Sequence, residues 1–194
     1  MGNDNPFTIT MDADKNITAL FGINTYTITA VSGDNGAVSP PVQTVNYGNT
    51  ASVVITPETG YHIDSVTDNG ADVTNSIVDN INGTYTYTTP AAAADHDVVV
   101  AFAIDTYTIT ATADSNGSIS PSGNIIVNYD SNQTFTITPD TGYIINQVIV
   151  DGSPVNPTSK TYTFNNVTGS HTISVTFVKI PDTTPPTLTL PGVN

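Results

Sequence analysis

The sequence predicts an all-β fold of tandem small antiparallel modules, sandwich-like in construction, and three observations lead to this expectation. Short runs alternate between apolar and polar side chains, as in Thr25–Ala30, which is the pattern of a half-buried strand. The same motifs recur at a fixed spacing, because 81 positions separate Tyr26 from Tyr107 and Phe21 from Phe102. Only 10% of the residues are charged, and no window has convincing helical periodicity.

Repeat one is predicted over residues 24–104. Its opening strand places Tyr26, Ile28 and Ala30 on one face and threonines on the other. Asn35-Gly36, a pair that tolerates positive φ, predicts a hairpin turn after this strand. Further strands are expected up to Asn46-Tyr47, over Ser52–Pro57, over 59–66 before an Asn69-Gly70 turn, at Tyr85-Thr-Tyr87, and over 96–102.

Repeat two is predicted over residues 105–179 and has the same motifs in the same order. Tyr85-Thr-Tyr87 is matched with Tyr162-Thr-Phe164, so repeat one has the longer loop before this strand. Asp68 stands where repeat two has the apolar Val150, and we therefore expect the neighbouring turn of repeat one to be reshaped.

The two ends of the chain are interpreted as parts of further units. Residues 1–23 contain the alternating run that begins at Phe7 and the run Asn16–Phe21, which together indicate the C-terminal hairpin of a truncated preceding repeat. Residues 180–194 begin with a Pro-rich linker, which is expected to be extended and fairly stiff. Thr187–Leu190 then alternates again, as in the first strand of a truncated next domain.

A set of motifs shared by the two repeats resembles the divergent internalin-type B-repeat family of bacterial surface proteins. The motifs are Thr-Tyr-Thr-Ile-Thr-Ala, Asn-Gly followed by Ser39-Pro40 or Ser120-Pro121, Ile-Thr-Pro-x-Thr-Gly-Tyr at 55–61 and 137–143, Val-Asp-Gly at 150–152, and the closing Tyr-Thr-Phe and Ile-Ser-Val-Thr-Phe. The resemblance covers roughly residues 7–178. Residues 182–190 look like the start of an immunoglobulin-like domain.

The resemblance implies an extracellular or cell-surface location, because this family occurs in tandem in large secreted and surface proteins. It carries over no catalytic residue. The related internalin repeat is similar to a β-grasp, which includes a helix, so β-grasp-like α+β modules are the alternative fold.

The expected function is a non-enzymatic spacer or stalk that presents other domains of the same parent chain. Two alternatives stay open at this point. One is an adhesin or carbohydrate-binding module, whose partner would be a host or matrix protein or a glycan, and a contiguous exposed aromatic or apolar patch would favour it. The other is an accessory domain of a secreted enzyme.

The charge balance argues against two classes of partner. The net charge is −14, from 17 acidic residues against three lysines. A nucleic acid or an anionic membrane surface therefore meets almost no cation that could displace its counterions. No stretch of the sequence approaches the length of a membrane span, so we expect no membrane insertion.

The sequence contains weak candidates for a site. Asp12, Asp14 and Asn16 occupy alternate positions in a turn and offer oxygen ligands that suit calcium. The loop lacks the glycine and the bidentate Glu of a strong calcium motif, so turn-forming carboxylates are the simpler interpretation. No other cofactor and no catalytic residue is expected. The matching positions of Tyr47 and Tyr129 favour packing in the core or at strand edges over ligand stacking.

Overall fold

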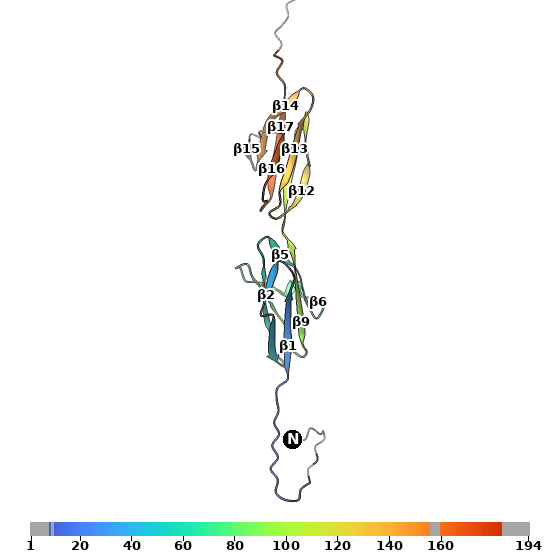
Figure 1. Cartoon of the computed structure of the whole chain (residues 1–194), viewed down its shortest axis with the longest axis vertical. Coiled ribbons are helices and arrows are strands. Elements are labelled where there is room, and N and C mark those ends of the chain that lie inside the picture. Colours follow the sequence, from blue (N-terminus) through green and yellow to red (C-terminus); the bar gives the residue numbers. More distant parts are fainter. Residues whose placement is uncertain (1–7, 9, 156–159, 184–194) are drawn as a thin grey trace, which may run out of the picture.

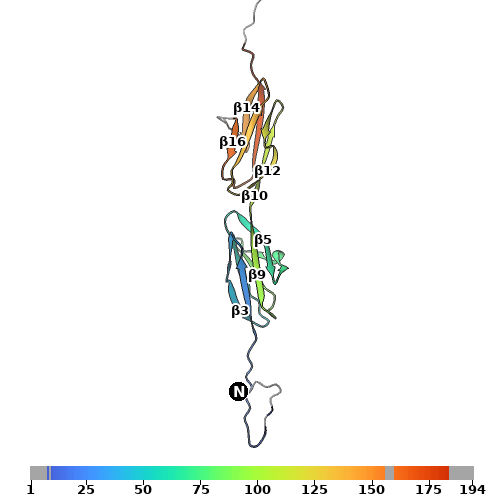
Figure 2. The same ribbon diagram turned by 45° about the vertical axis from the view of Figure 1, so that its right-hand side comes forward.

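The structure is a computed structural model that describes residues 8, 10–155 and 160–183. Two β-sandwiches follow one another along the long axis of the molecule, with the earlier part of the chain in one and the later part in the other (Figures 1 and 2). Strands account for nearly all regular structure, which confirms the predicted all-β class. Residues 10–24 precede the first sandwich and form no strand.

Repeat one contains nine strands and a single 3-10 turn, η1 (Thr74–Ser76). The strands are β1 (Thr25–Ser32), β2 (Gly36–Ser39), β3 (Val42–Asn46), β4 (Ser52–Pro57), β5 (Tyr61–Asp68), β6 (Ala71–Asp72), β7 (Val78–Asp79), β8 (Tyr85–Thr88) and β9 (His96–Ile104). One sheet has the order β3-β1-β9-β5-β6 and the other has the order β2-β4-β8-β7.

The described residues of repeat two form eight strands, arranged as in repeat one except that β7 has no counterpart among them. They are β10 (Thr106–Ala113), β11 (Gly117–Ser120), β12 (Gly123–Asn128), β13 (Gln133–Pro139), β14 (Tyr143–Val150), β15 (Ser153–Val155), β16 (Thr161–Phe164) and β17 (His171–Lys179). The sheet orders are β12-β10-β17-β14-β15 and β11-β13-β16. The described residues contain no α-helix, so the β-grasp alternative is wrong. They also contain no helix with the length and apolar character needed to cross a membrane.

The core of each repeat lies between its two sheets. In repeat one, Ile28 and Val98 from the first sheet meet Val53 and Ile55 from the second, and all four are fully buried. Alternate residues of β1 face outward, where Thr25 and Thr27 are exposed and Thr29 is half-buried, as the period of two requires. Burying each Val or Ile side chain contributes about 1.5–3 kcal/mol, so these inward-facing positions supply most of the stability.

The first and last strands of each repeat are parallel neighbours, which the sequence did not predict. β1 pairs with β9 from Ile28 with His96 onward, and β10 pairs with β17 from Ile109 with His171 onward. Because the two strands run in the same direction, the chain enters a repeat at one end and leaves it at the other (Figure 1). Every other strand pair in the described residues is antiparallel.

The predicted hairpin at Asn35-Gly36 is wrong, although a turn does occur there. β1 pairs with β3 and β9, whereas β2 pairs with β4, so the turn moves the chain from one sheet to the other. Asn35 has the positive φ of 68°. A Cβ on Gly36 would lie 2.3 Å from the ring of Phe102, so the glycine is required by packing. The same contact joins Gly117 and Phe177, at 2.4 Å.

The matching of Tyr85 with Tyr162 is also wrong. Strand pairing places Tyr87 opposite Val53 and Tyr162 opposite Phe135, so Tyr87 is the counterpart of Tyr162. The Asn69-Gly70 turn occurs as predicted, because β5 and β6 pair directly on either side of it. Both residues of this turn have positive φ, at 51° and 81°, as a tight hairpin of this kind requires. The reshaping expected from Asp68 is wrong, because Asp151 and Gly152 of repeat two have nearly the same φ angles, 49° and 77°.

Asp68 forms a buried polar network in repeat one. Its side chain is 6% exposed and accepts a hydrogen bond of 2.7 Å from the hydroxyl of Tyr87. The Nδ1 atom of His96 lies 2.8 Å from both carboxylate oxygens and donates to them, because an ionised carboxylate only accepts. Burial, the hydrogen bond from Tyr87 to Asp68 and the charge of Asp68 all raise the pKa of Tyr87 above its usual value.

Repeat two has a solvent-exposed version of the same contact. His171, the counterpart of His96, donates from Nδ1 to Asp151 at 2.7 Å, and the two side chains are 30% and 47% exposed. Burial raises the pKa of Asp151, but hydrogen bonds from the Thr172 amide and from His171 outweigh it, so the pKa is lowered. The position of Asp68 is occupied by the buried Val150.

Replacing Asp68 by Ala is expected to lower the free energy of unfolding of repeat one by about 2–4 kcal/mol, because the buried Tyr87 hydroxyl and the His96 imidazole lose their acceptor. The control Asp151→Asn keeps a side chain that tolerates the positive φ of 49° and can still accept from the Thr172 amide, so it weakens only an exposed carboxylate–histidine contact and is expected to cost about 1 kcal/mol or less. Urea unfolding followed by circular dichroism, with hydrogen exchange resolved by repeat, measures both. Equal losses in the two variants would show that burial of the network contributes nothing.

Candidate functional site at the joint between the repeats

A single residue connects the two sandwiches. β9 ends at Ile104 and β10 begins at Thr106, so only Asp105 lies between the last strand of repeat one and the first strand of repeat two. A chain segment this short cannot act as a flexible tether. The contacts of Asp105 therefore decide how the two repeats are held together.

Both backbone polar groups of Asp105 are bonded, one to each repeat. The amide of Asp105 donates to the carbonyl oxygen of Gly60 in repeat one, at 2.8 Å. The carbonyl oxygen of Asp105 accepts from the amide of Tyr129 in repeat two, also at 2.8 Å. These two bonds restrict rotation of the connecting residue on both sides.

The side chain of Asp105 adds a polar contact on the repeat-one side. Its Oδ1 atom lies 2.8 Å from Nδ1 of His62, and the two side chains are 34% and 55% exposed. Exposed contacts between polar side chains of this kind contribute at most about 1 kcal/mol, because water competes with them. The contact therefore orients the joint more than it stabilises it.

The ring of Tyr129 packs closely against Gly60 across the joint. A Cβ on Gly60 would lie 2.2 Å from the Cδ1 atom of Tyr129 and 2.5 Å from its Cγ atom. The φ angle of Gly60 is +83°, in the region that favours glycine. Both the close approach and the backbone angle therefore require glycine in the Thr-Gly-Tyr turn.

Each outer end of the pair of repeats has one half of this arrangement. At one end the amide of Tyr47 donates to the carbonyl of Asn24, at 2.8 Å, and we call Asn24 with Tyr26 and Tyr47 the head surface. At the other end the amide of Ile180 donates to the carbonyl of Gly142, at 2.8 Å, and we call these two residues the tail surface. At the joint, Gly60 and Asp105 correspond to the tail surface, and Asp105, Tyr107 and Tyr129 correspond to the head surface.

The candidate calcium ligands lie away from this joint. Asp12, Asp14 and Asn16 are exposed in the segment before β1, and Lys15 forms an ion pair of 2.6 Å with Asp12. This contact lowers the pKa of the Asp12 carboxyl. In the part of the chain that the structure describes, no three His, Cys, Asp or Glu side chains gather where they could hold a metal. Calcium binding through Asp12, Asp14 and Asn16 stays a prediction.

Sequence reasoning found the joint residues but not their role. Tyr47 and Tyr129 were expected in the core or at strand edges. Both directly follow the edge strands β3 and β12, and the structure adds that Tyr47 is 59% exposed and that Tyr129 packs across the joint. The available signal was the repeated Thr-Gly-Tyr motif, together with the near absence of a linker between Phe102 and Tyr107.

Gly60→Ala is expected to loosen the joint, because the added methyl group would overlap the ring of Tyr129. The matched control is Gly142→Ala, where φ is +86° but nothing lies within 4 Å of the added Cβ. Backbone strain, about 1 kcal/mol, is therefore common to both variants, and only the contact differs.

The measurement uses spin labels on cysteines introduced at Thr44 and Ile126, since the chain has no Cys of its own. Both positions are exposed. They correspond to each other, because Thr44 pairs with Thr27, Ile126 pairs with Thr108, and Thr27 and Thr108 are 81 positions apart in the sequence. The distance distribution between the labels should broaden for Gly60→Ala and stay narrow for Gly142→Ala. The same width in both variants would contradict a role for the Gly60–Tyr129 contact.

The comparison with known families matches both repeats. The divergent InlB B-repeat domain matches the chain twice, over residues 26–105 and 107–181. No curated protein and no solved structure shows significant similarity to the chain. Domains of this family are typical of bacterial surface proteins and are generally non-enzymatic. Because the two matches together cover most of the sequence, this chain belongs to the divergent InlB B-repeat family.

Proposed function

We propose that the chain is a non-enzymatic spacer, part of the stalk of a bacterial secreted or cell-surface protein. The observation that supports this function best is the joint at Asp105, where one residue is bonded to both repeats and Tyr129 packs on Gly60. A joint of this kind resists bending. Each repeat then adds its own length to the array, as a stalk requires.

The parallel pairing of first and last strands supports the same function. Because the chain enters and leaves each repeat at opposite ends, a series of repeats extends without turning back (Figures 1 and 2). The partners of the stalk are the other domains of the parent chain, and its location is outside the cell. The net charge of −14 favours a solvated rod that does not associate with itself.

A binding module has less support from the described residues. Their exposed aromatic side chains are Phe21 and Tyr47, and Tyr47 lies on the head surface, where its counterpart Tyr129 makes the joint. This position accounts for the exposure of Tyr47 without a glycan or protein ligand. Among the described residues, the aromatic ring paired with Tyr47 is the half-buried Tyr26, which also belongs to the head surface, so the pair does not by itself call for a sugar ligand.

The spacer function predicts a stiff, extended molecule in solution. Spin labels at positions 44 and 126 should give one narrow distance distribution, because Asp105 and Tyr129 allow little relative rotation of the repeats. Small-angle scattering of the full chain should show a rod whose maximum dimension grows linearly when a repeat is added. A broad label distribution, or the scattering of two freely jointed bodies, would refute the spacer function.

A further inference from the structure

We propose that the head surface of repeat one, formed by Asn24, Tyr26 and Tyr47, is a docking surface for the tail surface of a further B-repeat joined to this chain through Asn24. The partner is thus another copy of the same kind of repeat, continuous in sequence with the segment before β1. This inference rests on the proposed spacer function and names the partner of its outer end.

The first argument is that the backbone of the head surface already has the conformation of the joint. The amide of Tyr47 donates to the carbonyl of Asn24 at 2.8 Å, as the amide of Tyr129 donates to the carbonyl of Asp105. Asn24 immediately precedes β1, as Asp105 immediately precedes β10. Asn24 therefore stands in the position of a joint residue, and its amide corresponds to the Asp105 amide that binds Gly60.

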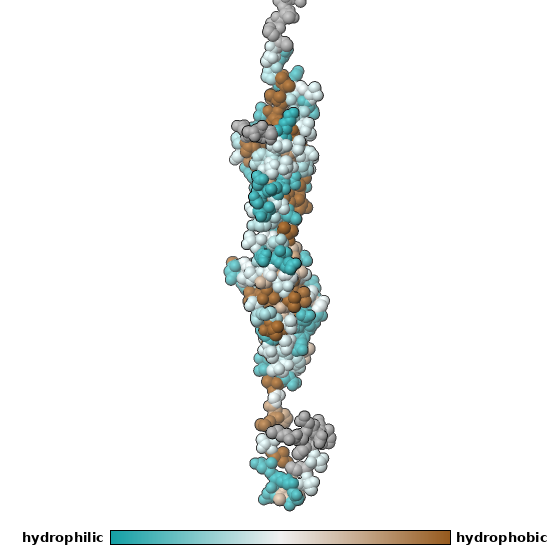
Figure 3. All heavy atoms as spheres, viewed as in Figure 1, coloured by the Kyte–Doolittle hydropathy of each residue, from teal (hydrophilic) through white to brown (hydrophobic). Residues whose placement is uncertain are grey.

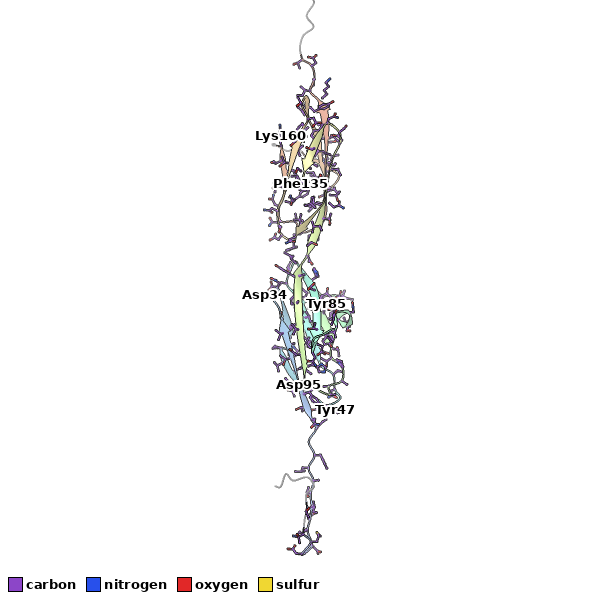
Figure 4. The ribbon with its side chains drawn as sticks, turned by 90° about the vertical axis from the view of Figure 1, so that its right-hand side faces the viewer. Asp34, Tyr47, Tyr85, Asp95, Phe135 and Lys160 are labelled. Atoms are coloured by element: carbon purple, nitrogen blue, oxygen red, sulfur yellow. The ribbon has the colours of Figure 1, made fainter. Side chains whose placement is uncertain are left out.

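The second argument is the exposure of the aromatic side chain. Tyr47 is 59% exposed, whereas the corresponding Tyr129 is half-buried, with its ring against Gly60. The ring centroids of Tyr47 and Tyr26 are 6.4 Å apart, which forms a small aromatic platform. Figure 4 places Tyr47 at the end of repeat one from which the preceding segment extends. A glycine turn would fit on this platform as Gly60 fits on Tyr129.

The third argument comes from the segment that leads into β1. Leu20, Phe21 and Ile23 are 87%, 95% and 63% exposed, and this part of the segment forms no strand. Figure 3 shows hydrophobic residues at this end of repeat one and along the segment before it. Phe21 has the sequence position of Phe102, whose ring packs on Gly36 inside repeat one. The lead segment therefore has the apolar pattern of the closing strand of a repeat.

The fourth argument is complementarity between the two ends of the molecule. The tail surface presents Gly142 at a φ of +86°, with nothing within 4 Å of the place of its Cβ, so an aromatic ring can approach it as Tyr129 approaches Gly60. A free second molecule cannot reproduce the joint, because one residue, Asp105, serves both halves of it. If two separate molecules met, Ile180 of one and Asn24 of the other would both have to occupy the place that Asp105 alone occupies in the joint. The partner must therefore be joined through the chain.

The test is a three-repeat protein in which a copy of residues 24–104 is inserted between Ile23 and Asn24, with every residue of the present chain retained. One pair of spin labels occupies position 44 in the inserted copy and position 44 in repeat one. A second protein carries labels at positions 44 and 126 of the present chain, which report on the existing joint. We expect the new joint to give a distribution as narrow as that of the existing one.

Two variants locate the contact. Tyr47→Ala in repeat one should broaden the distribution at the new joint as much as Tyr129→Ala broadens it at the existing joint. In the present two-repeat chain Tyr47→Ala should leave the label distribution unchanged, because Tyr47 lies away from the existing joint, and should lower the thermal midpoint only slightly, because the ring is 59% exposed and packs on Tyr26. Gly60→Ala in the inserted copy should reproduce the effect of Tyr47→Ala, and the two together should not be additive.

The outcomes separate this inference from the proposed function. A broad distribution at the new joint, with a narrow one at the existing joint, would overturn the docking surface and leave the spacer function standing. A new joint that is narrow but insensitive to Tyr47→Ala would also overturn it, because the aromatic contact would then be dispensable. Broad distributions at both joints would refute the spacer function itself.

Discussion

The parallel pairing of the first and last strands is the constraint on which the rest of the structure depends. β9 lies between β1 and β5 in the middle of its sheet, and it runs in the same direction as β1. An antiparallel closing strand would return the chain to the end at which it entered. A parallel one delivers it to the far end, where the next repeat begins after a single residue. The extended arrangement of the two sandwiches follows from this one choice of direction.

The joint shows how a small surface holds two domains in order. Its parts are two backbone hydrogen bonds to Asp105, the contact of Tyr129 with Gly60, and the exposed pair of His62 with Asp105. None of these is strong alone. The two backbone bonds and the His62 contact act on one residue, Asp105, and the contact of Tyr129 with Gly60 joins the same two repeats. Together they restrict rotation about the connecting residue.

Comparison of the two repeats separates the requirements of the fold from local solutions. Both repeats keep a glycine under the ring of the closing Phe, at Gly36 and Gly117, because a Cβ there would force the ring to move. At the position of Val150, in contrast, repeat one buries a carboxylate and satisfies it with Tyr87 and His96. An apolar residue fills the site without partners, whereas a buried charge is tolerated only with a full set of donors.

Within the two repeats the sequence by itself determined most of the strands, their inward faces and the repetition, because alternation of side chains is a local property that reports burial directly. The runs that start at Tyr26 and Tyr107 are examples, and the family resemblance follows from the same motifs. The run Asn16–Phe21 also alternates but forms no strand. Only the tertiary structure decided which strands are neighbours: Asn35-Gly36 has the local signal of a hairpin but joins two sheets, since pairing depends on contacts between distant segments. The partners of Asp68, and the place of Tyr129 on Gly60, were hidden for the same reason: both arise where residues far apart in the chain are brought together by packing.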